Sequence, residues 1–324
     1  MDSLQLKLLP VEHKVLRDLR KVGGEGHHIL VAVSGGRDSM VLLTLLKRLQ
    51  PLIKSPLYVG HIHHGRGDRV QTIFRNRARR FVKKSSSLLN LPFYTNKTLP
   101  RAILRSEAEL RNFRYKELQK ILTKISRKSA ATPYLALAHH QDDLLETQII
   151  RLIRGTGLYG LKAMSVLSEE KLRPLLKCTG EEIQDLANKL NVRWLDDPSN
   201  ENRDTLRNWL RHKWLLDLEK KIPGSKTSLA RSLSNISSND KKSTINVLPI
   251  HKQSLSRPEF LFLSRDEKCS IVARYLVCLK ISHYTQGQIE EIVRRLDNRR
   301  GEFRFRLLNH EWRVNAERIQ ALKV

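Results

Sequence analysis

The first two thirds of the chain alternate short apolar runs with longer segments in which apolar residues recur at helical spacing. Strands are predicted at 29–33, 57–62, 91–95, 134–138 and 192–195, where the letters read "ILVAV", "LYVGHI", "LPFYT", "YLALA" and "VRWL". Helices are predicted over 40–49, 70–89, 106–125, 142–154 and 203–221. Ser106 with Glu109 and Thr179 with Glu182 are possible capping boxes at helix starts. This rhythm predicts an α/β fold, a parallel sheet with helices on both faces. Such sheets bind ligands at the carboxyl ends of their strands.

The last third of the chain has a different pattern. Residues 222–258 are rich in Ser, Asn and Lys, with one candidate short helix at "SLARSLSNI". Helical spacing returns over 259–297, and alternation from residue 302 onward predicts a terminal β-hairpin. We therefore predict a catalytic domain over 1–216, a linker over 217–258 and a smaller α+β domain over 259–324.

Charge is the most informative feature of the composition. The chain has 60 Lys and Arg against 33 Asp and Glu, a formal net charge of +27. Such an excess attracts polyanions, which favours nucleic acid as a partner over an acidic membrane surface or an acidic protein. No apolar stretch reaches the length of a transmembrane helix, and the first ten residues lack the layout of a signal peptide. A cytoplasmic protein without a membrane partner is expected.

Cysteine usage argues against several classes of site. The three cysteines, Cys178, Cys269 and Cys278, are dispersed and form no CxxC pair. A disulfide framework and a cysteine-based zinc or iron–sulfur site are therefore not expected.

A glycine pair interrupts the first predicted strand–helix unit, in "VAVSGGRDS" (31–39). Glycine lets the backbone turn sharply, and the following helix begins with free N–H groups, so the turn can bind an anion such as phosphate. Asp38 suits this place if Mg²⁺ lies between it and the phosphates. The loop is neither a GxxxxGK[ST] phosphate loop nor a GxGxxG dinucleotide loop. An ordinary turn with a capping aspartate is the alternative.

A second polar cluster follows the fourth predicted strand, in "AHHQDDLLET" (138–147). Asp142, Asp143 and Glu146 could complete a Mg²⁺ site, and His139 could stabilise charge that develops on a phosphate. A helix amino terminus decorated with acids is the alternative, and zinc is a weaker one. Two helices also carry runs of cations that could contact phosphates, with solvated helix faces as the alternative. These cations are Arg75, Arg77, Arg79, Arg80, Lys83 and Lys84 on the first helix, and Arg203, Arg207 and Arg211 on the second.

The motifs over residues 28–216 resemble a known family. "SGGRDS" is similar to the loop of the N-type ATP pyrophosphatases, which cleave ATP between the α- and β-phosphates. "HHQDDLLET", "RGTGLYGL", "RPLL", "WLDDPSN" and "SEAELRNFRY" together resemble the tRNA(Ile)-lysidine synthetases, in a short form. One segment departs from the family, because Arg66 and Gly67 follow His61, His64 and Gly65 where the family has Leu-Arg.

The resemblance implies a set of site residues. It implies catalytic roles for Asp38, His139 and Asp143, and Mg²⁺ ligation by Asp38, Asp142 and Asp143. It implies ATP binding by Ser34, Gly35, Gly36, Arg37, Asp38, Ser39 and His61. It implies contacts with tRNA or substrate by Arg79, Arg111, Arg114, Arg154, Asn200, Arg207, Asn208 and Arg211.

The resemblance also implies a reaction and its partners. The wobble cytidine of a CAU-anticodon tRNA(Ile) would be adenylated by ATP, and free L-lysine would then displace AMP to give lysidine. A homodimer is left open. The alternatives are a tRNA thiolation enzyme, a small-molecule amide ligase and a non-catalytic RNA-binding protein. The missing CxxC pairs, the basic charge and the intact acids argue against these three in turn.

Overall fold

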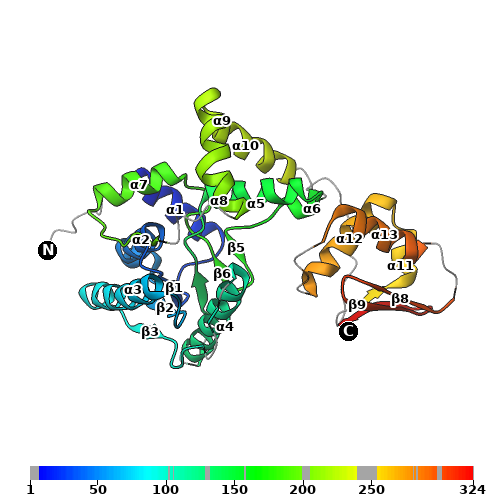
Figure 1. Cartoon of the computed structure of the whole chain (residues 1–324), viewed down its shortest axis with the longest axis horizontal. Coiled ribbons are helices and arrows are strands. Elements are labelled where there is room, and N and C mark those ends of the chain that lie inside the picture. Colours follow the sequence, from blue (N-terminus) through cyan, green and yellow to red (C-terminus); the bar gives the residue numbers. More distant parts are fainter. Residues whose placement is uncertain are drawn as a thin grey trace. The chain divides into compact units, whose positions relative to one another are not determined.

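The computed structural model describes residues 7–100, 103–104, 106–127, 132–156, 158–198, 205–238, 254–279, 281, 284–297 and 301–323 (Figure 1). The chain forms two compact units. The first comprises Met1–Leu144 and Met164–Lys213, and the second Leu145–Ala163 and Trp214–Val324. The domain boundaries predicted at residues 216 and 258 stay predictions. No helix in the described ranges is long and apolar enough to cross a membrane.

A six-stranded sheet in the order β3-β2-β1-β4-β6-β5 forms the centre of the first unit. Its strands are β1 Ile29–Ala32, β2 Leu57–His61, β3 Phe93–Thr95, β4 Tyr134–Ala136, β5 Leu167–Ser168 and β6 Lys171–Leu172. All neighbours are parallel except β5, which runs antiparallel to β6 at the edge. The predicted parallel sheet and its first four strands are confirmed. The strand predicted at 192–195 is wrong, because this segment turns to the loop after β1, where the Leu195 N–H donates to the Gly35 carbonyl (3.0 Å).

Helices cover both faces of this sheet. The cluster on one face receives side chains from α1 Pro10–Lys21, α2 Arg37–Ile53, α3 Arg69–Leu88 and α7 Gly180–Lys189. The cluster on the other face receives α4 Glu107–Ser126. The strand β1 shows why both faces are apolar: Val31 packs on the α2 side, whereas its neighbour Leu30 packs with Leu118 of α4. Period-two alternation thus requires apolar residues at every position of a doubly covered strand.

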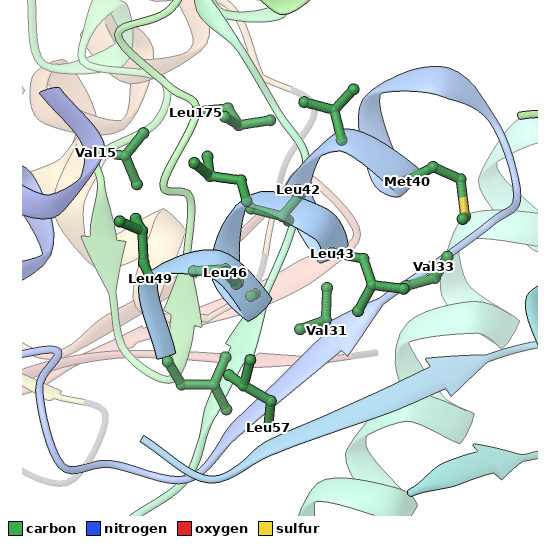
Figure 2. Close-up of a cluster of buried hydrophobic side chains, with 14 of the residues drawn as sticks. Val15, Val31, Val33, Met40, Leu42, Leu43, Leu46, Leu49, Leu57 and Leu175 are labelled. Atoms are coloured by element: carbon green, nitrogen blue, oxygen red, sulfur yellow. The ribbon is translucent and has the colours of Figure 1, made fainter. Parts of the chain in front are cut away.

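The helix α2 is apolar almost all round because it is covered on several sides. Figure 2 shows Met40 and Leu43 turned toward the strand residues Val31 and Val33, and Leu42 on the side of Leu175. The helix begins directly after the glycine pair. Burial of this helix therefore fixes the position of the loop that precedes it.

Predicted helix starts are confirmed at two capping boxes. The Ser106 hydroxyl accepts the Glu109 N–H at the start of α4, and the Thr179 hydroxyl accepts the Glu182 N–H at the start of α7. The helix predicted over 203–221 is observed as α8 Leu206–Trp209, a π-helical turn Leu210–Trp214 and α9 Leu215–Lys221. The amino-terminal helix α1 was not predicted from the sequence.

The second unit combines helices with an antiparallel sheet of strand order β7-β10-β9-β8. Its strands are β7 Ser254–Ser256, β8 Phe303–Leu307, β9 His310–Val314 and β10 Arg318–Lys323. Trp312, Tyr275 and Phe260 are its largest fully buried side chains. The predicted terminal hairpin is present as β8 and β9, and α10 Ser225–Ser238 confirms the predicted short helix. The other helices are α5 Gln141–Ile153, which starts in the first unit, α6 Leu158–Leu161, α11 Arg257–Phe262, α12 Arg265–Cys278 and α13 Gln286–Asp297.

Candidate active site

The loop between β1 and α2 is organised around the Ser39 hydroxyl. This hydroxyl donates to the Gly36 carbonyl (2.9 Å) and accepts the N–H groups of Ser34 (3.2 Å) and Gly35 (3.3 Å). Gly35 has a φ of +102°, a conformation that side-chain-bearing residues rarely adopt. The first N–H groups of α2, at 37–39, have no acceptor within the helix. The loop therefore holds its own shape and presents a helix amino terminus suited to an anion.

Two carboxylates of the site converge on one imidazole, that of His140. Its Nε2 lies 3.7 Å from Asp38 Oδ2 and 3.5 Å from Asp143 Oδ2. The Asp143 Oδ2 atom also accepts the His140 backbone N–H (3.1 Å). The Arg37 Nε donates to Asp38 Oδ1 (2.8 Å) and its guanidinium also reaches the Gln184 side chain (3.0 Å). The acids that follow β1 and β4 thus meet at the carboxyl ends of these strands, as the parallel topology predicts.

Asp143 is held in the ionised form. Its other oxygen, Oδ1, accepts a hydrogen bond from Arg211 at 2.7 Å. Burial works to raise the pKa of the Asp143 carboxyl, but His140, Arg211 and the backbone hydrogen bond together hold it below its ordinary value. The sequence placed Arg211 among the tRNA contacts, whereas the structure pairs it with a site carboxylate.

His139, the predicted catalytic histidine, lies on the side of the site rich in cations. Burial first, and then the charges of Arg173, Arg111 and Arg114, lower the pKa of His139 to about 4, although Asp143 opposes this shift. Its imidazole is therefore neutral at pH 7, and its Nδ1 is buried with no hydrogen-bond partner. A neutral imidazole with an unpaired ring nitrogen can exchange a hydrogen bond with a substrate.

A cluster of cations surrounds the ring of Tyr115 on α4. Arg111, Arg114 and Lys171 lie 5.3, 5.6 and 5.6 Å from the ring centroid. The Nε atoms of Arg114 and Arg173 are buried without a partner, and burial lowers the pKa of both guanidinium groups. Several cations with unpaired donors in one place favour an external anion. Arg111 and Arg114 were predicted, whereas Lys171 and Arg173 were missed as site residues although "RPLL" had drawn attention to Arg173.

His61 and His64, at and after the end of β2, are two further largely buried histidines of the first unit. The His61 Nδ1–H donates to the Val33 carbonyl (2.8 Å), and burial lowers the pKa of His61 to about 4. His64 was not assigned a role from the sequence, but burial and Arg114 lower its pKa to about 4, and its Nδ1 is buried without a partner. His61 is only 4% exposed, and its hydrogen bond to Val33 supports the start of the loop after β1.

The remaining predicted residues lie elsewhere. The Asp142 Oδ2 atom lies beside Gly180, 2.8 Å from where a Cβ would stand, so a larger residue at 180 would require the Asp142 carboxylate to shift. Arg79 is exposed on α3, and its charge adds to burial, the main cause, in lowering the pKa of His61 and of His63. Arg154 is exposed after α5 and belongs to the second unit. Arg207 and Asn208 are half-buried on α8, and Asn200 lies outside the described residues.

The donor set fits a hard cation in part. Asp38 and Asp143 supply two carboxylate oxygens on one side of His140, and Mg²⁺ is commonly held by one or two carboxylates together with substrate phosphates. Across the described ranges, no group of three or more His, Cys, Asp or Glu residues is arranged to hold a metal by itself. Phosphate oxygens would therefore have to complete the coordination, which agrees with a nucleotide site.

Comparison with known proteins agrees with this geometry. Residues 9–218 match the family model described as the PP-loop domain. The tRNA(Ile)-lysidine synthase of Bdellovibrio bacteriovorus is 36% identical over 315 residues, which cover 96% of this chain and 96% of that protein. The tRNA(Ile)-lysidine synthase of Thermotoga maritima is 38% identical over 189 residues, which cover 58% of this chain and 44% of that longer protein.

A solved structure supports the fold alone. The U34-tRNA thiolase NcsA from Methanococcus maripaludis matches with a TM-score of 0.54 at 21% identity, covering 70% of this chain and 78% of that chain. At this identity the likeness extends to the arrangement of strands and helices, and the chemistry must come from the site itself.

Proposed function

The chain belongs to the tRNA(Ile)-lysidine synthase family, ATP-dependent ligases with a PP-loop domain, and on this premise we propose the reaction that it catalyses. It joins L-lysine to C2 of the wobble cytidine in a tRNA(Ile) with the anticodon CAU, and converts ATP to AMP and pyrophosphate. The observation that carries this proposal is the 36% identity to a synthase over 96% of both chains. The modified base then pairs with the codon AUA in place of AUG.

The first step adenylates the base. The cytosine O2 attacks the α-phosphate of ATP, the bond to the β-phosphate breaks, and pyrophosphate leaves. Because an amide-like oxygen is a weak nucleophile, positioning and charge neutralisation must lower most of the barrier. The loop from Ser34 to Ser39 and the amino terminus of α2 receive the phosphates. The unpaired Nδ1 of His139, as the N–H tautomer, donates to an oxygen that gains charge.

Asp38 and Asp143 would hold Mg²⁺, and Asp142, whose Oδ2 lies beside Gly180, is retained as a proposed further ligand. This ion would neutralise phosphate charge when bound. His140 is a positioning residue in this scheme, because it contacts both Asp38 and Asp143 and orients their Oδ2 atoms.

In the second step, lysine displaces AMP from the adenylated cytidine. The neutral ε-amine attacks C2 of the adenylated cytidine, a C–N bond forms, the C2–O bond to AMP breaks, and the departing phosphate takes the proton that the amine nitrogen loses. Because the pKa of Asp143 is low, this carboxylate would orient the amine by its charge and would be a poor proton acceptor. Arg79, Arg111, Arg114, Arg154, Asn200, Arg207 and Asn208 are retained as proposed tRNA or substrate contacts. The reaction is proposed for the cytoplasm, and a homodimer stays a prediction.

Thiolation is disfavoured by the cysteines themselves. Burial raises the pKa of the Cys178 thiol to about 11, which makes it a poor nucleophile and metal ligand. Cys269 lies in the second turn of α12 and Cys278 is the last residue of this helix, about 13.5 Å away along its axis. Neither arrangement provides the adjacent thiols that an iron–sulfur centre needs.

The test is mass spectrometry of a CAU-anticodon tRNA(Ile) after incubation with the protein, ATP and L-lysine. We expect a gain equal to one lysine less one water, confined to the wobble nucleotide. Omission of ATP or of lysine, or a tRNA with a GAU anticodon, should abolish the gain. An unchanged mass with the complete mixture, or incorporation of sulfur, would contradict the proposal.

A further inference from the structure

A surface pocket lies between α3 and the segment 192–196 of the first unit. Its cavity volume is about 470 Å³, and Arg77, one of the cations predicted to contact phosphates, lines it. We refer to it as the Trp194 pocket. It is lined by Arg77, Phe81, Val192, Arg193, Trp194, Leu195 and Asp196.

The lining of the Trp194 pocket combines aromatic rings with cations. Phe81 and Trp194 are half-buried and pack against the core with their inner sides, so each ring is fixed in place. Arg77 and Arg193 are exposed, and within the described part of the chain neither forms an ion pair. The nearby acid, Asp196, already accepts the Trp194 indole N–H at 3.0 Å. Two cations thus face one carboxylate, and rigid rings beside an excess of cations are the features that bind single-stranded nucleic acid, by stacking and phosphate contact.

The pocket is joined to the loop after β1 by direct contacts. The Leu195 N–H donates to the Gly35 carbonyl at 3.0 Å. On the other wall, Ala78 and Val82 of α3 lie 3.6 and 3.5 Å from the Cβ position of Gly35. Both walls of the pocket therefore rest on the residue that shapes the proposed phosphate loop. A nucleotide in the pocket would be close to a base that reacts at that loop.

We propose that the Trp194 pocket binds an unpaired nucleotide of the substrate tRNA, the adenine that follows the target cytidine in the CAU anticodon. Its base stacks on Trp194 and Phe81, and the adjoining phosphates contact Arg77 and Arg193. This inference rests on the proposed function, because it assumes that a tRNA is the substrate. Holding the neighbouring base would keep the target cytidine out of the anticodon stack, which it must leave to reach ATP.

The test is a cycle of binding measurements with the full chain and two tRNAs, without turnover. One tRNA is intact and the other has an abasic site in place of the anticodon adenine. We expect Trp194→Leu to weaken binding of the intact tRNA about tenfold, and the abasic site to weaken wild-type binding by a similar factor. Because both changes remove the same stack, their combination should lose little more than either alone.

A second variant leaves the two aromatic rings, which pack against the core, unchanged. Arg77→Glu with Arg193→Glu alters only exposed side chains, and it should weaken tRNA binding and reduce its salt dependence. Arg17→Glu with Lys21→Glu on α1, two exposed cations that also form no ion pair within the described residues, is the matched charge control and should weaken binding much less. Circular dichroism and ATP binding should be unchanged in every variant.

Two results would overturn the proposal. The first is tRNA binding within twofold of wild type by both pocket variants, which would assign the pocket to another partner, such as an acidic peptide. The second is a loss of affinity, for Trp194→Leu with the abasic tRNA, equal to the product of the two separate fold-losses, because independent effects multiply in this way. A wild-type protein that binds this tRNA but forms no lysidine would instead contradict the proposed function, and the binding cycle would still report on the pocket.

Discussion

At the scale of single residues, two histidines that are adjacent in the chain have different surroundings and therefore different proposed roles in the site. His139 and His140 are adjacent in the sequence, yet His140 contacts the two carboxylates and His139 lies among arginines. Both follow the end of β4 at Ala136, three residues before His139, and their side chains lie in different surroundings. One imidazole can orient acids and the other can contact substrate, and substitution of each should give a different kinetic signature.

Asp38→Asn should abolish ATP-dependent adenylation while tRNA affinity stays within a few-fold of wild type. The amide keeps the size of the side chain but removes the charge that opposes His140 and would ligate a cation. Pyrophosphate release and filter binding of tRNA measure the two effects separately. Turnover at the wild-type rate would remove Asp38 from the proposed metal site.

His140→Asn and His139→Asn form a matched pair. We expect His140→Asn to raise the Mg²⁺ concentration needed for half-maximal activity several-fold, because Asp38 and Asp143 lose their common partner. His139→Asn should lower the adenylation rate about tenfold or more and leave that Mg²⁺ requirement unchanged. Titrations of initial rate against Mg²⁺ check both, and the opposite assignment would exchange the roles given to the two residues.

At the scale of elements, the helix from Leu206 to Lys221 shows how a change of helix type redirects a side chain. Arg207 and Arg211 would share one face of a regular α-helix, and their spacing predicts a row of cations that contacts RNA phosphates. The π-helical turn Leu210–Trp214 widens the helix at Arg211, and this arginine pairs with Asp143 at 2.7 Å. One member of the row is thus used inside the site.

Arg207→Ala should lower tRNA affinity and reduce the slope of log K against log salt by about one, the change expected for one lost phosphate contact. Arg211→Gln is the contrasting variant, and it should lower adenylation far more than tRNA affinity because it leaves Asp143 without its cation. Fluorescence anisotropy of labelled tRNA over a range of salt measures the slopes. An unchanged slope for Arg207→Ala would give this arginine a structural role.

At the scale of the whole molecule, an excess of positive charge coexists with several buried neutral histidines. The formal net charge of +27 favours binding to a polyanion, and it destabilises the compact native state because like charges repel. His61, His64 and His139 each have a pKa lowered to about 4, chiefly by burial. These groups stay neutral in the native state at pH values where the unfolded chain protonates them.

Stability should therefore fall as the pH falls from about 6.5 to 4. In this window the unfolded state binds more protons than the native state, so the free energy of unfolding decreases with acidification, by up to about 1.4 kcal/mol per pH unit for each such histidine. Urea denaturation at pH 7, 6 and 5 measures the slope, and His61→Asn should make it shallower. An equally steep slope in that variant would show that His61 does not contribute.

The sequence by itself determined the α/β alternation, the glycine turn after β1, the capping boxes and the family. Each of these is local, because a period of two or 3.6, a cap or a motif involves residues close together in the chain. It did not reveal α1 or the short strands β5 and β6, and it placed a strand at 192–195 where the chain instead turns to Gly35.

Only the tertiary structure decided which side chains share the site. β6 pairs with β4, and the Leu137 N–H donates to the Leu172 carbonyl (2.9 Å), so Arg173 comes beside His139 from 34 residues away in the chain. Arg211 reaches Asp143 across 68 residues in the same way. Contacts of this kind depend on strand order and on the packing of helices over the sheet, and no short-range pattern of apolar and polar residues encodes them.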